Sequence, residues 1–255
     1  MSDNRFKQFL ADAGDMTGFV IRFFRELFKP RQEWRELIRQ CYYVGYSSLS
    51  LVGVTAFIMG LVLTIQSRPT LVEFGAEAWL PKMISVSLVR EIAPVITALI
   101  CAGKVGSGIG AELGSMKVTE QIDAMDVSGT NPFKYLVVTR VMATTLMLPV
   151  LAIIADAIAL YGGYLGANIK GVVSWELYWT QVFDALSYSD LMPAFIKTYF
   201  FGFAIGIVGC YKGFNSNKGT EGVGRSANTA VVVASLAVFL IDLIAVQIAD
   251  LLGFT

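Results

Sequence analysis

Five ionisable residues lie inside stretches of sequence that are otherwise apolar enough to cross a membrane: Arg90, Glu91, Asp156, Lys197 and Asp242. A charged side chain inside a bilayer costs at least about 2.5 kcal/mol, so it normally faces a partner, a cavity or the bundle interior. These residues suit either structural ion pairs or a polar cavity that receives a lipid headgroup. A guanidinium offers a fork of donors to phosphate oxygens, so Arg90 is the best candidate for binding the headgroup. We expect Glu91 and Asp242 to hold Arg90 in place when no lipid is bound.

Five apolar segments must position these residues. The sequence predicts membrane spans at 41–67, 83–115, 133–169, 191–212 and 226–252, since a span needs about 20 mainly apolar residues. The composition agrees, with 55% hydrophobic and 16% charged residues and a mean hydropathy of +0.61. We therefore expect an all-α membrane protein with one domain over residues 1–255.

Positive residues predict the orientation of the spans. Fourteen Lys and Arg residues fall on one side of the five crossings and three on the other, Arg68, Lys82 and Lys170. By the positive-inside rule, the side with fourteen faces the cytoplasm. The N-terminus is then cytoplasmic and the C-terminus periplasmic or outside. The polar first fifteen residues lack the apolar run of a secretory signal, so we expect no cleaved leader.

A helix at 16–29 precedes the first span. Its apolar residues recur at helical spacing opposite Arg and Lys, and Pro30 follows. A Phe-rich face opposite cations, directly before a span, favours a helix lying in the membrane interface over a helix of a soluble core.

A second short helix is predicted at 117–126, between spans two and three. Val118, Ile122 and Met125 share one face, and Glu120 and Asp123 lie elsewhere. An idle linker is usually polar and rich in Gly and Pro, so the apolar face favours a helix that docks on a partner.

Glycines and missing residue types narrow the function further. Gly106, Gly110 and Gly114 share one helix face, which predicts close packing either within the bundle or between subunits. Gly103-Lys104 lacks the other residues of a phosphate-binding loop. The chain has no histidine, so the usual zinc sites and imidazole-based catalysis are absent, and its formal net charge of +0 gives no sign of nucleic-acid binding. We expect no catalytic residue, metal or cofactor in this chain.

Several segments together resemble the MlaE permease family of bacterial lipid-transport ABC systems, called YrbE in the Mce systems. The resemblance spans roughly 34–248, and its most specific block is 112–125; the other matching segments are Val89-Arg90-Glu91-Ile92-Ala93-Pro94-Val95, Ala102-Gly103-Lys104-Val105-Gly106-Ser107, Asn131-Pro132, Arg140 and 206–228. Two features look closer to the Mce-associated branch, Trp34-Arg35-Glu36 with Gln40-Cys41 and Gly209-Cys210-Tyr211-Lys212-Gly213, which leaves the substrate open.

The resemblance implies a homodimeric inner-membrane permease that moves phospholipid or a related hydrophobic lipid. Two cytoplasmic ATPase subunits, which bind ATP and magnesium, would grip the short helix as a coupling helix, an MCE-domain protein would cover the outer face, and a small STAS-type subunit is a possible addition. The residues it assigns to ATPase coupling are Glu112, Lys117, Glu120, Ile122, Asp123 and Met125.

Other functions remain open at this point. An ion- or proton-coupled secondary transporter would use Asp156 and Asp242 as carriers. An intramembrane enzyme of lipid metabolism would use Glu91 or Asp156 as acid or base. An Mce-type importer of sterol or fatty acid would keep the permease architecture and change the substrate.

Overall fold

The computed structural model contains helices and no strand in the residues that it describes, which are 2–30, 33–169, 171, 173–216 and 219–253. Five helical runs in these residues are long and apolar enough to cross a membrane: Trp34–Glu73, Glu77–Val118, Phe133–Asn168, Tyr188–Phe214 and Thr220–Leu251. The prediction of an all-α membrane protein with five spans is confirmed. Three of the cations counted for orientation, Arg31, Lys170 and Lys218, lie outside the described residues.

The helical runs differ from the predicted ranges mostly by being longer. The first is α2 (Trp34–Glu73), the fourth α9 (Tyr188–Phe214) and the fifth α10 (Thr220–Leu251). Hydropathy marks the apolar centre of a span, whereas the helix continues into its polar flanks. The second run joins η1 (Glu77–Trp79), α3 (Leu80–Ser87), η2 (Leu88–Ile92), α4 (Ala93–Cys101), η3 (Ala102–Gly106) and α5 (Ser107–Val118), and the third joins η4 (Phe133–Val138) to α7 (Thr139–Asn168).

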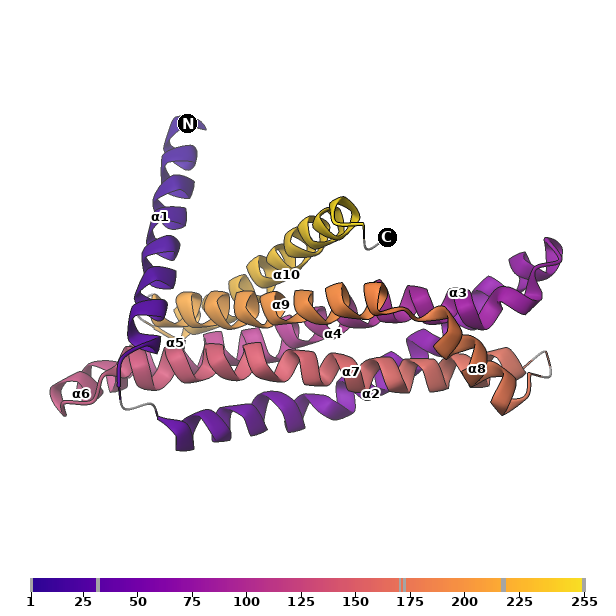
Figure 1. Cartoon of the computed structure of the whole chain (residues 1–255). Coiled ribbons are helices and arrows are strands. Elements are labelled where there is room, and N and C mark those ends of the chain that lie inside the picture. Colours follow the sequence, from indigo (N-terminus) through magenta and orange to yellow (C-terminus); the bar gives the residue numbers. More distant parts are fainter. Residues whose placement is uncertain (1, 31–32, 170, 172, 217–218, 254–255) are drawn as a thin grey trace.

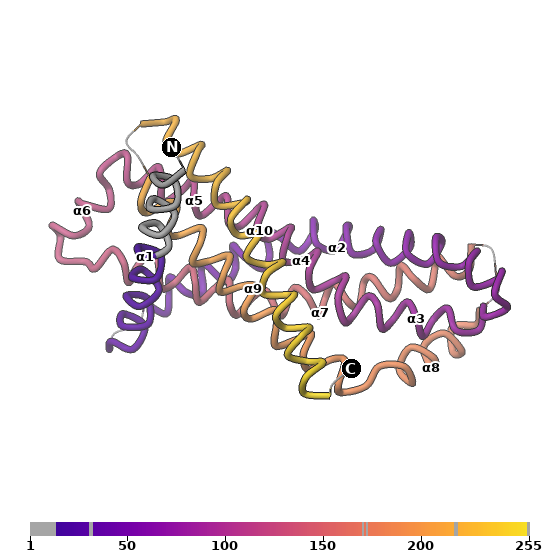
Figure 2. The backbone as a smooth tube through the Cα atoms, turned by 90° about the horizontal axis from the view of Figure 1, so that it is seen from above, coloured from indigo at the N-terminus to yellow at the C-terminus, as the bar shows by residue number. Residues whose placement is uncertain are grey.

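The long helices form a bundle with two distinct ends (Figure 1, Figure 2). The short helix α6 (Gln121–Val127) lies at one end, beside the start of α7. The helix α8 (Trp175–Ala185) and the start of α3 lie at the other end. The sequence did not predict α8, which forms in the loop after α7; Ser174 caps it by accepting a hydrogen bond from the Leu177 amide at 3.2 Å.

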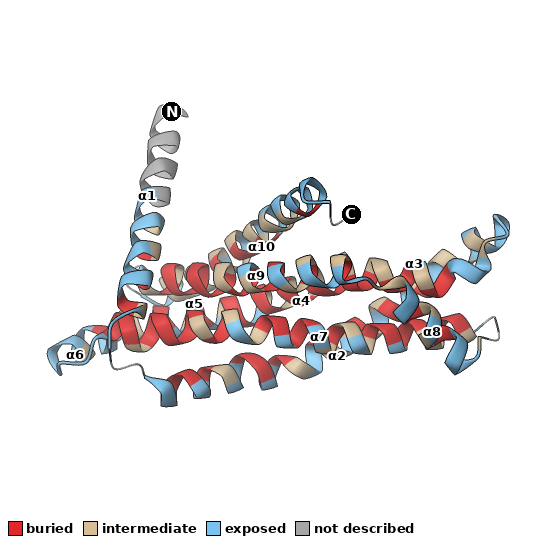
Figure 3. Cartoon of the chain, in the orientation of Figure 1, coloured by how far each residue is buried: buried red, intermediate tan, exposed pale blue. Residues whose placement is uncertain are grey.

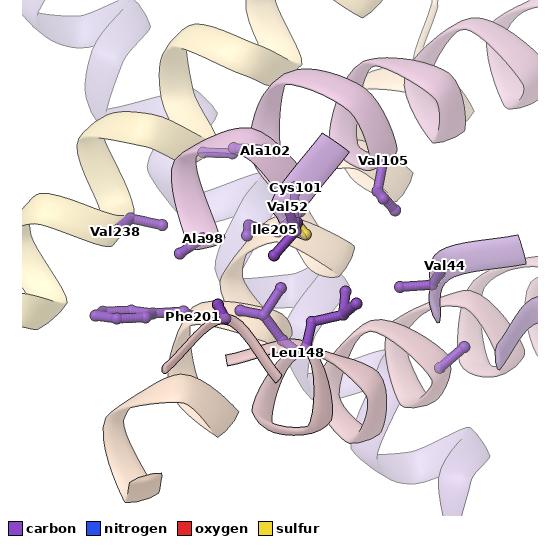
Figure 4. Close-up of a cluster of buried hydrophobic side chains, with 14 of the residues drawn as sticks. Val44, Val52, Ala98, Cys101, Ala102, Val105, Leu148, Phe201, Ile205 and Val238 are labelled. Carbon is purple, nitrogen blue, oxygen red and sulfur yellow. The ribbon is translucent and has the colours of Figure 1, made fainter. Parts of the chain in front are cut away.

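The core runs through the centre of the bundle and consists of small and medium apolar side chains. Figure 4 shows side chains from five of the long helical runs or their π-helical segments meeting there: Val44, Val52, Ala98, Cys101, Ala102, Val105, Leu148, Phe201, Ile205 and Val238. Cys101 and Cys210 are buried free thiols, as expected for small apolar packing residues. The helix α10 contributes least to this core. Only 17% of its apolar 18-residue stretch is buried inside the chain, against 50% of the corresponding stretch of α9. Figure 3 shows the same contrast by colour, with α10 mostly tan and pale blue.

The N-terminal helix α1 (Ser2–Leu27) stands across the end of the bundle rather than along it (Figure 1). Phe19 and Phe23 are buried and attach it to the bundle, and Phe19 contacts Phe133 edge to face at 4.9 Å between ring centroids. The Glu26 carboxylate accepts hydrogen bonds from Lys29 and from Asn131, the latter at 2.9 Å. The hydrogen bond from Lys29 is the main reason why the pKa of Glu26 lies below its usual value. A helix crossing the bundle end is the geometry that an interfacial helix requires.

Close approach of α2 and α7 supplies a direct test of the packing. A Cβ atom at Gly60 would overlap the backbone carbonyl of Ala159. We therefore expect Gly60→Ala to force the two helices apart, to destabilise the fold by about 1 to 3 kcal/mol and to lower the thermal midpoint of the detergent-purified chain. Gly103→Ala is the matched control, because a Cβ there meets no atom within 4 Å. Equal midpoints for the two variants would contradict the helix packing described here.

Candidate functional site

The π-helical segment η2 carries Arg90 and Glu91 into the centre of the bundle. A π-helical turn contains an extra residue, which rotates the following side chains relative to a regular helix and often marks a functional site. Pro94 follows in the first turn of α4. As a result, Glu91 points toward α9 while Arg90 points toward the start of the same helix, where their partners lie.

Lys197 is the centre of a buried cluster that joins three helical runs. Its Nζ lies 2.6 Å from Glu91 Oε2 and 2.9 Å from Asp242 Oδ1. The Lys197 side chain is only 3% exposed, whereas that of Glu91 is 39% exposed. The ammonium therefore depends on these two carboxylates in place of water, and it fixes η2, α9 and α10 at one depth. We call these three residues the Lys197 cluster.

Arg90 does not belong to the Lys197 cluster, and the expectation that Glu91 and Asp242 hold it is wrong. Its Nη1 lies 3.7 Å from Asp190 Oδ1, in the first turn of α9. Asp190 also accepts hydrogen bonds from the Ser187 amide and hydroxyl, so it caps this helix. Lys197 donates hydrogen bonds to the two carboxylates that we had assigned to Arg90.

Asp156 lies apart from the other four candidate residues. It faces a cavity of about 280 Å³ between α7 and α9, next to Pro94 and Thr198. Its Oδ1 is buried and has no hydrogen-bond partner in the described part of the chain. The structure thus brings Glu91, Lys197 and Asp242 together and places Arg90 on a neighbouring ion pair. Asp156 has no ion pair within 4.0 Å in the described residues, but it lies close enough to Lys197 to feel its charge.

An apolar cavity of about 420 Å³ opens beside the Lys197 cluster, between α9 and α10. In Figure 1 the two helices diverge toward the C-terminus. Lys197 is the one charged residue among the lining side chains; the others are Met192, Pro193, Ile196, Phe200, Ile241, Ile244, Ala245, Ile248, Ala249 and Leu252. A polar cluster next to an apolar cavity is the arrangement that an amphipathic ligand needs. Within the described residues, no group of three His, Cys, Asp or Glu side chains could hold a metal ion.

The short loop helix occupies residues 121–127 rather than 117–126. Lys117 belongs to the last turn of α5, and its Nζ lies 3.0 Å from Asp123 Oδ1. Glu120 separates the two helices in a left-handed conformation, with a φ of 58°. This single backbone reversal interrupts the helix that the sequence pattern predicted as continuous.

Two coupling residues on α6 are placed differently from the prediction. Ile122 is 3% exposed and Met125 is partly buried, and both pack against the core of their own chain. They therefore anchor α6 to the bundle instead of filling a groove on a partner. Val127, which the sequence analysis missed, is 90% exposed at the end of α6. Val127 lies beyond the last residue of the apolar stripe, Met125, so the predicted helix ended at residue 126 and did not include it.

Glu112 likewise has a partner within its own chain. Its carboxylate forms a two-point ion pair with Arg140, with 2.8 Å between Arg140 Nη2 and Glu112 Oε1 and 3.4 Å between the Nε and Oε2 atoms. Arg140 Nη1 also donates to the Leu136 carbonyl at 3.0 Å. The pair joins α5 to α7 on either side of α6.

The glycine stripe on η3 and α5 packs inside the chain. A Cβ at Gly110 would lie 3.3 Å from the Ser226 carbonyl and 3.3 Å from Ala230 Cβ on α10. Gly106 faces Ile205 on α9, and Gly114 faces Ser216 and Val223. Of the two interpretations, packing within one bundle accounts for this stripe.

Comparisons with known proteins identify the family of this chain. The family described as Permease MlaE matches residues 37–248. A probable ABC transporter permease protein of Rickettsia typhi is 38% identical over 233 residues, covering 91% of this chain and 90% of the relative. A probable ABC transporter permease protein of Synechocystis is 36% identical, covering 91% and 88%. The intermembrane phospholipid transport system permease protein MlaE of Haemophilus influenzae is 34% identical, covering 89% and 88%.

These matches reach across all five spans and include η2, α6 and α10. The relatives are named as permease subunits, a role distinct from that of the ATP-hydrolysing subunit of an ABC transporter. The chain is therefore a multi-pass membrane permease and not an enzyme, and it belongs to the MlaE permease family.

Proposed function

We propose that this permease moves a phospholipid or a related hydrophobic lipid between the inner membrane and an MCE-domain protein. The observation that carries the proposal is the Lys197 cluster at the edge of the apolar cavity between α9 and α10. The cavity offers apolar walls to acyl chains, and the charged groups beside it offer contacts to a headgroup. The relative from Haemophilus influenzae is named for intermembrane phospholipid transport, which agrees with this substrate class.

Arg90 is the residue that we assign to the headgroup. Its side chain is 30% exposed and lies beside Asp190 at the start of α9, so part of the guanidinium can be reached by a ligand. Its planar fork of donors suits phosphate oxygens. Lys197 is less suitable for this role, because two carboxylates already surround it.

A second copy of the chain would complete the cavity, so we propose a homodimer. The face of α10 that points away from the bundle exposes large apolar side chains, among them Phe239, Leu243 and Ile244. Asp242 lies on the same helix. A single chain leaves the cavity beside Lys197 partly open. Two copies that meet along α10 would enclose this opening and would shield the charges of the Lys197 cluster from the surrounding lipid.

The end of the bundle that carries α6 is the side that we assign to the ATPase, with ATP and magnesium bound by that partner. Glu120, Asp123 and Val127 are exposed there and offer two carboxylates and one apolar side chain for docking. Ile122 and Met125 would pass the movement of α6 to the core against which they pack. The positive-inside prediction places this end in the cytoplasm, where a STAS-type subunit would also bind.

The opposite end is the side that we assign to the MCE-domain protein. Exposed aromatic side chains lie there on three elements: Trp79 at the end of η1, Trp175 at the start of α8 and Tyr188 at the start of α9. Trp and Tyr rings favour the boundary between lipid and water and serve well as contact residues. A lipid leaving the cavity between α9 and α10 toward this end would pass Arg90 and Asp190.

Lipid photo-crosslinking in the complex of the permease with its ATPase tests this function. We expect Arg90→Ala to reduce the crosslinking of a phospholipid probe roughly tenfold or more, because a charge-assisted hydrogen bond contributes about 1.5 to 3 kcal/mol. Arg90→Lys should recover only part of the signal, since an ammonium lacks the planar fork. A sterol and a fatty acid probe, run in parallel, separate the substrate classes.

Arg68→Gln is the matched control for this experiment. Arg68 also forms an ion pair, with Glu77 at 2.5 Å, but it lines neither cavity of the site. It should leave lipid crosslinking unchanged. Unchanged crosslinking in an intact Arg90→Ala complex would remove Arg90 from the binding site, and a loss of complex yield would assign it a structural role instead.

A further inference from the structure

A second polar site lies at the α6 end of the bundle, and it shares no lining residue with the apolar cavity beside Lys197. A cleft of about 800 Å³ opens between α1, the end of α9 and the start of α10. Its lining residues are mainly polar: Asp15, Gly18, Phe19, Arg22, Tyr211, Lys212, Asn215, Gly222, Arg225, Ser226 and Thr229. Three cations from three different helices thus face one space, together with a single carboxylate. We call it the basic cleft.

Aromatic rings form one wall of the basic cleft and hold two of its cations. The guanidinium carbon of Arg22 lies 4.2 Å from the centroid of the Phe133 ring, and Lys212 Nζ lies 5.3 Å from that of Tyr211. Phe19 packs edge to face against both rings, at 4.9 and 5.5 Å. Cation–π contacts fix the position of a charge without neutralising it. The aromatic wall therefore presents two cations whose charge remains available.

Carboxylates close to the basic cleft do not neutralise it. Within the described residues, neither Lys212 nor Arg225 has an ion pair within 4.0 Å, although Glu221 lies one turn before Arg225 on α10. Arg22 senses the charge of Glu26, but that carboxylate is already bound by Lys29 and Asn131. Three cations against Asp15 leave an excess of positive charge at this site.

The position of the cleft favours a membrane lipid as the anion that it binds. The Phe-rich face of α1 predicts that this helix lies at the level of the membrane headgroups, and the positive-inside prediction places this end in the cytoplasm. The leaflet there carries anionic lipids. The hydroxyl groups of Ser226 and Thr229 and the amide of Asn215 add hydrogen-bonding groups for phosphate oxygens.

We propose that the basic cleft binds the phosphate headgroup of an anionic phospholipid of the cytoplasmic leaflet. The bound headgroup bridges α1 to α9 and α10 because its phosphate oxygens accept hydrogen bonds from Arg22, Lys212 and Arg225. Met16, Phe19, Val20, Phe23 and Leu27 of α1 pack against the core. A lipid in the cleft adds a polar link between this helix and the membrane surface. This lipid is a resident ligand and not the transported one, so the proposal does not rest on the function proposed above.

Lipid binding by the complete chain in nanodiscs tests the proposal. A photoreactive residue at Thr229 should crosslink to phosphatidylglycerol and not to phosphatidylcholine. Because each charge-assisted contact to the phosphate contributes about tenfold in affinity, Lys212→Gln with Arg225→Gln should weaken phosphatidylglycerol binding roughly a hundredfold. Both residues lie at the bundle surface or its edge, and an unchanged elution profile of the variant shows that it is folded.

Arg25→Gln is the matched control, because Arg25 is an exposed cation on α1 that does not line the cleft. It should bind phosphatidylglycerol as the unmodified chain does. An equal loss in Arg25→Gln, or no loss in the double variant, would overturn the proposal. Competition by free glycerol phosphate as effective as that by the lipid would identify a soluble phosphate ligand instead, and crosslinking of Thr229 to the ATPase would identify a protein contact; either result refutes a lipid site.

Discussion

Replacing Lys197 with methionine should sharply reduce the yield of assembled permease. Lys197 is 3% exposed and lies between Glu91 and Asp242, so the substitution leaves two carboxylates facing each other without their cation. Removing one partner of a buried ion pair costs about 3 to 5 kcal/mol, a large part of the stability of a typical protein. The measurement is the amount of monodisperse complex recovered in mild detergent, with its thermal midpoint.

A triple variant separates stability from function. Lys197→Met combined with Glu91→Gln and Asp242→Asn removes the stranded charges together with their partner, and we expect it to recover most of the lost yield. If the Lys197 cluster contributes to lipid movement, the triple variant assembles but transports poorly. Full recovery of both assembly and ATP-driven lipid transfer would reduce the cluster to a structural ion pair. Normal assembly of the single variant would contradict the burial of Lys197.

The sequence predicted the membrane helices well because the bilayer imposes a simple rule. About 20 apolar residues must be helical to cross it, so hydropathy alone located all five helical runs. Their ends were less predictable, because the polar flanks of α2 and α10 remain helical outside the apolar core. The helix α8 was missed since a short interfacial helix needs only a cap and a few aromatic residues, which a loop also contains.

The pairing of the buried charges was harder to predict than their presence. Insertion costs imply that Arg90, Glu91, Lys197 and Asp242 need partners, but not which ones. The π-helical segment η2 changes the direction of the side chains within it, and nothing in the local sequence marks that extra residue. Arg90 therefore meets Asp190, which lies directly before the predicted fourth span at 191–212.

The placement of α6 gives a similar lesson. The apolar stripe of Val118, Ile122 and Met125 correctly indicated a face that needs a cover. The same pattern is produced whether that cover is a partner subunit or the rest of the chain, and in the structure the chain itself buries Ile122. Periodicity reports burial and does not identify the surface that buries a side chain.

Substitution of Glu112 should destabilise the permease more than substitution of its partner Arg140. Glu112→Ala leaves the Arg140 guanidinium, which is 3% exposed, without a counter-ion, at a cost of about 3 to 5 kcal/mol. Arg140→Met leaves the Glu112 carboxylate, which is 55% exposed and can be hydrated, so we expect a cost nearer about 1 kcal/mol. Thermal midpoints of the two purified variants, compared with the unmodified chain, give the order directly.

The same pair bears on how ATP hydrolysis reaches the membrane. Glu112 and Arg140 join α5 to α7 across the segment that contains α6, so in the coupling role that we propose for α6 the pair holds the base of this helix. Glu112→Gln keeps the shape and one acceptor oxygen; it should retain the ATPase but weaken the dependence of ATP hydrolysis on lipid. If Glu112 contacted the ATPase instead, Glu112→Gln would release that subunit while Arg140→Met would not. Loss of lipid dependence in both variants, with the ATPase still bound, is the result expected from an ion pair that acts within the permease.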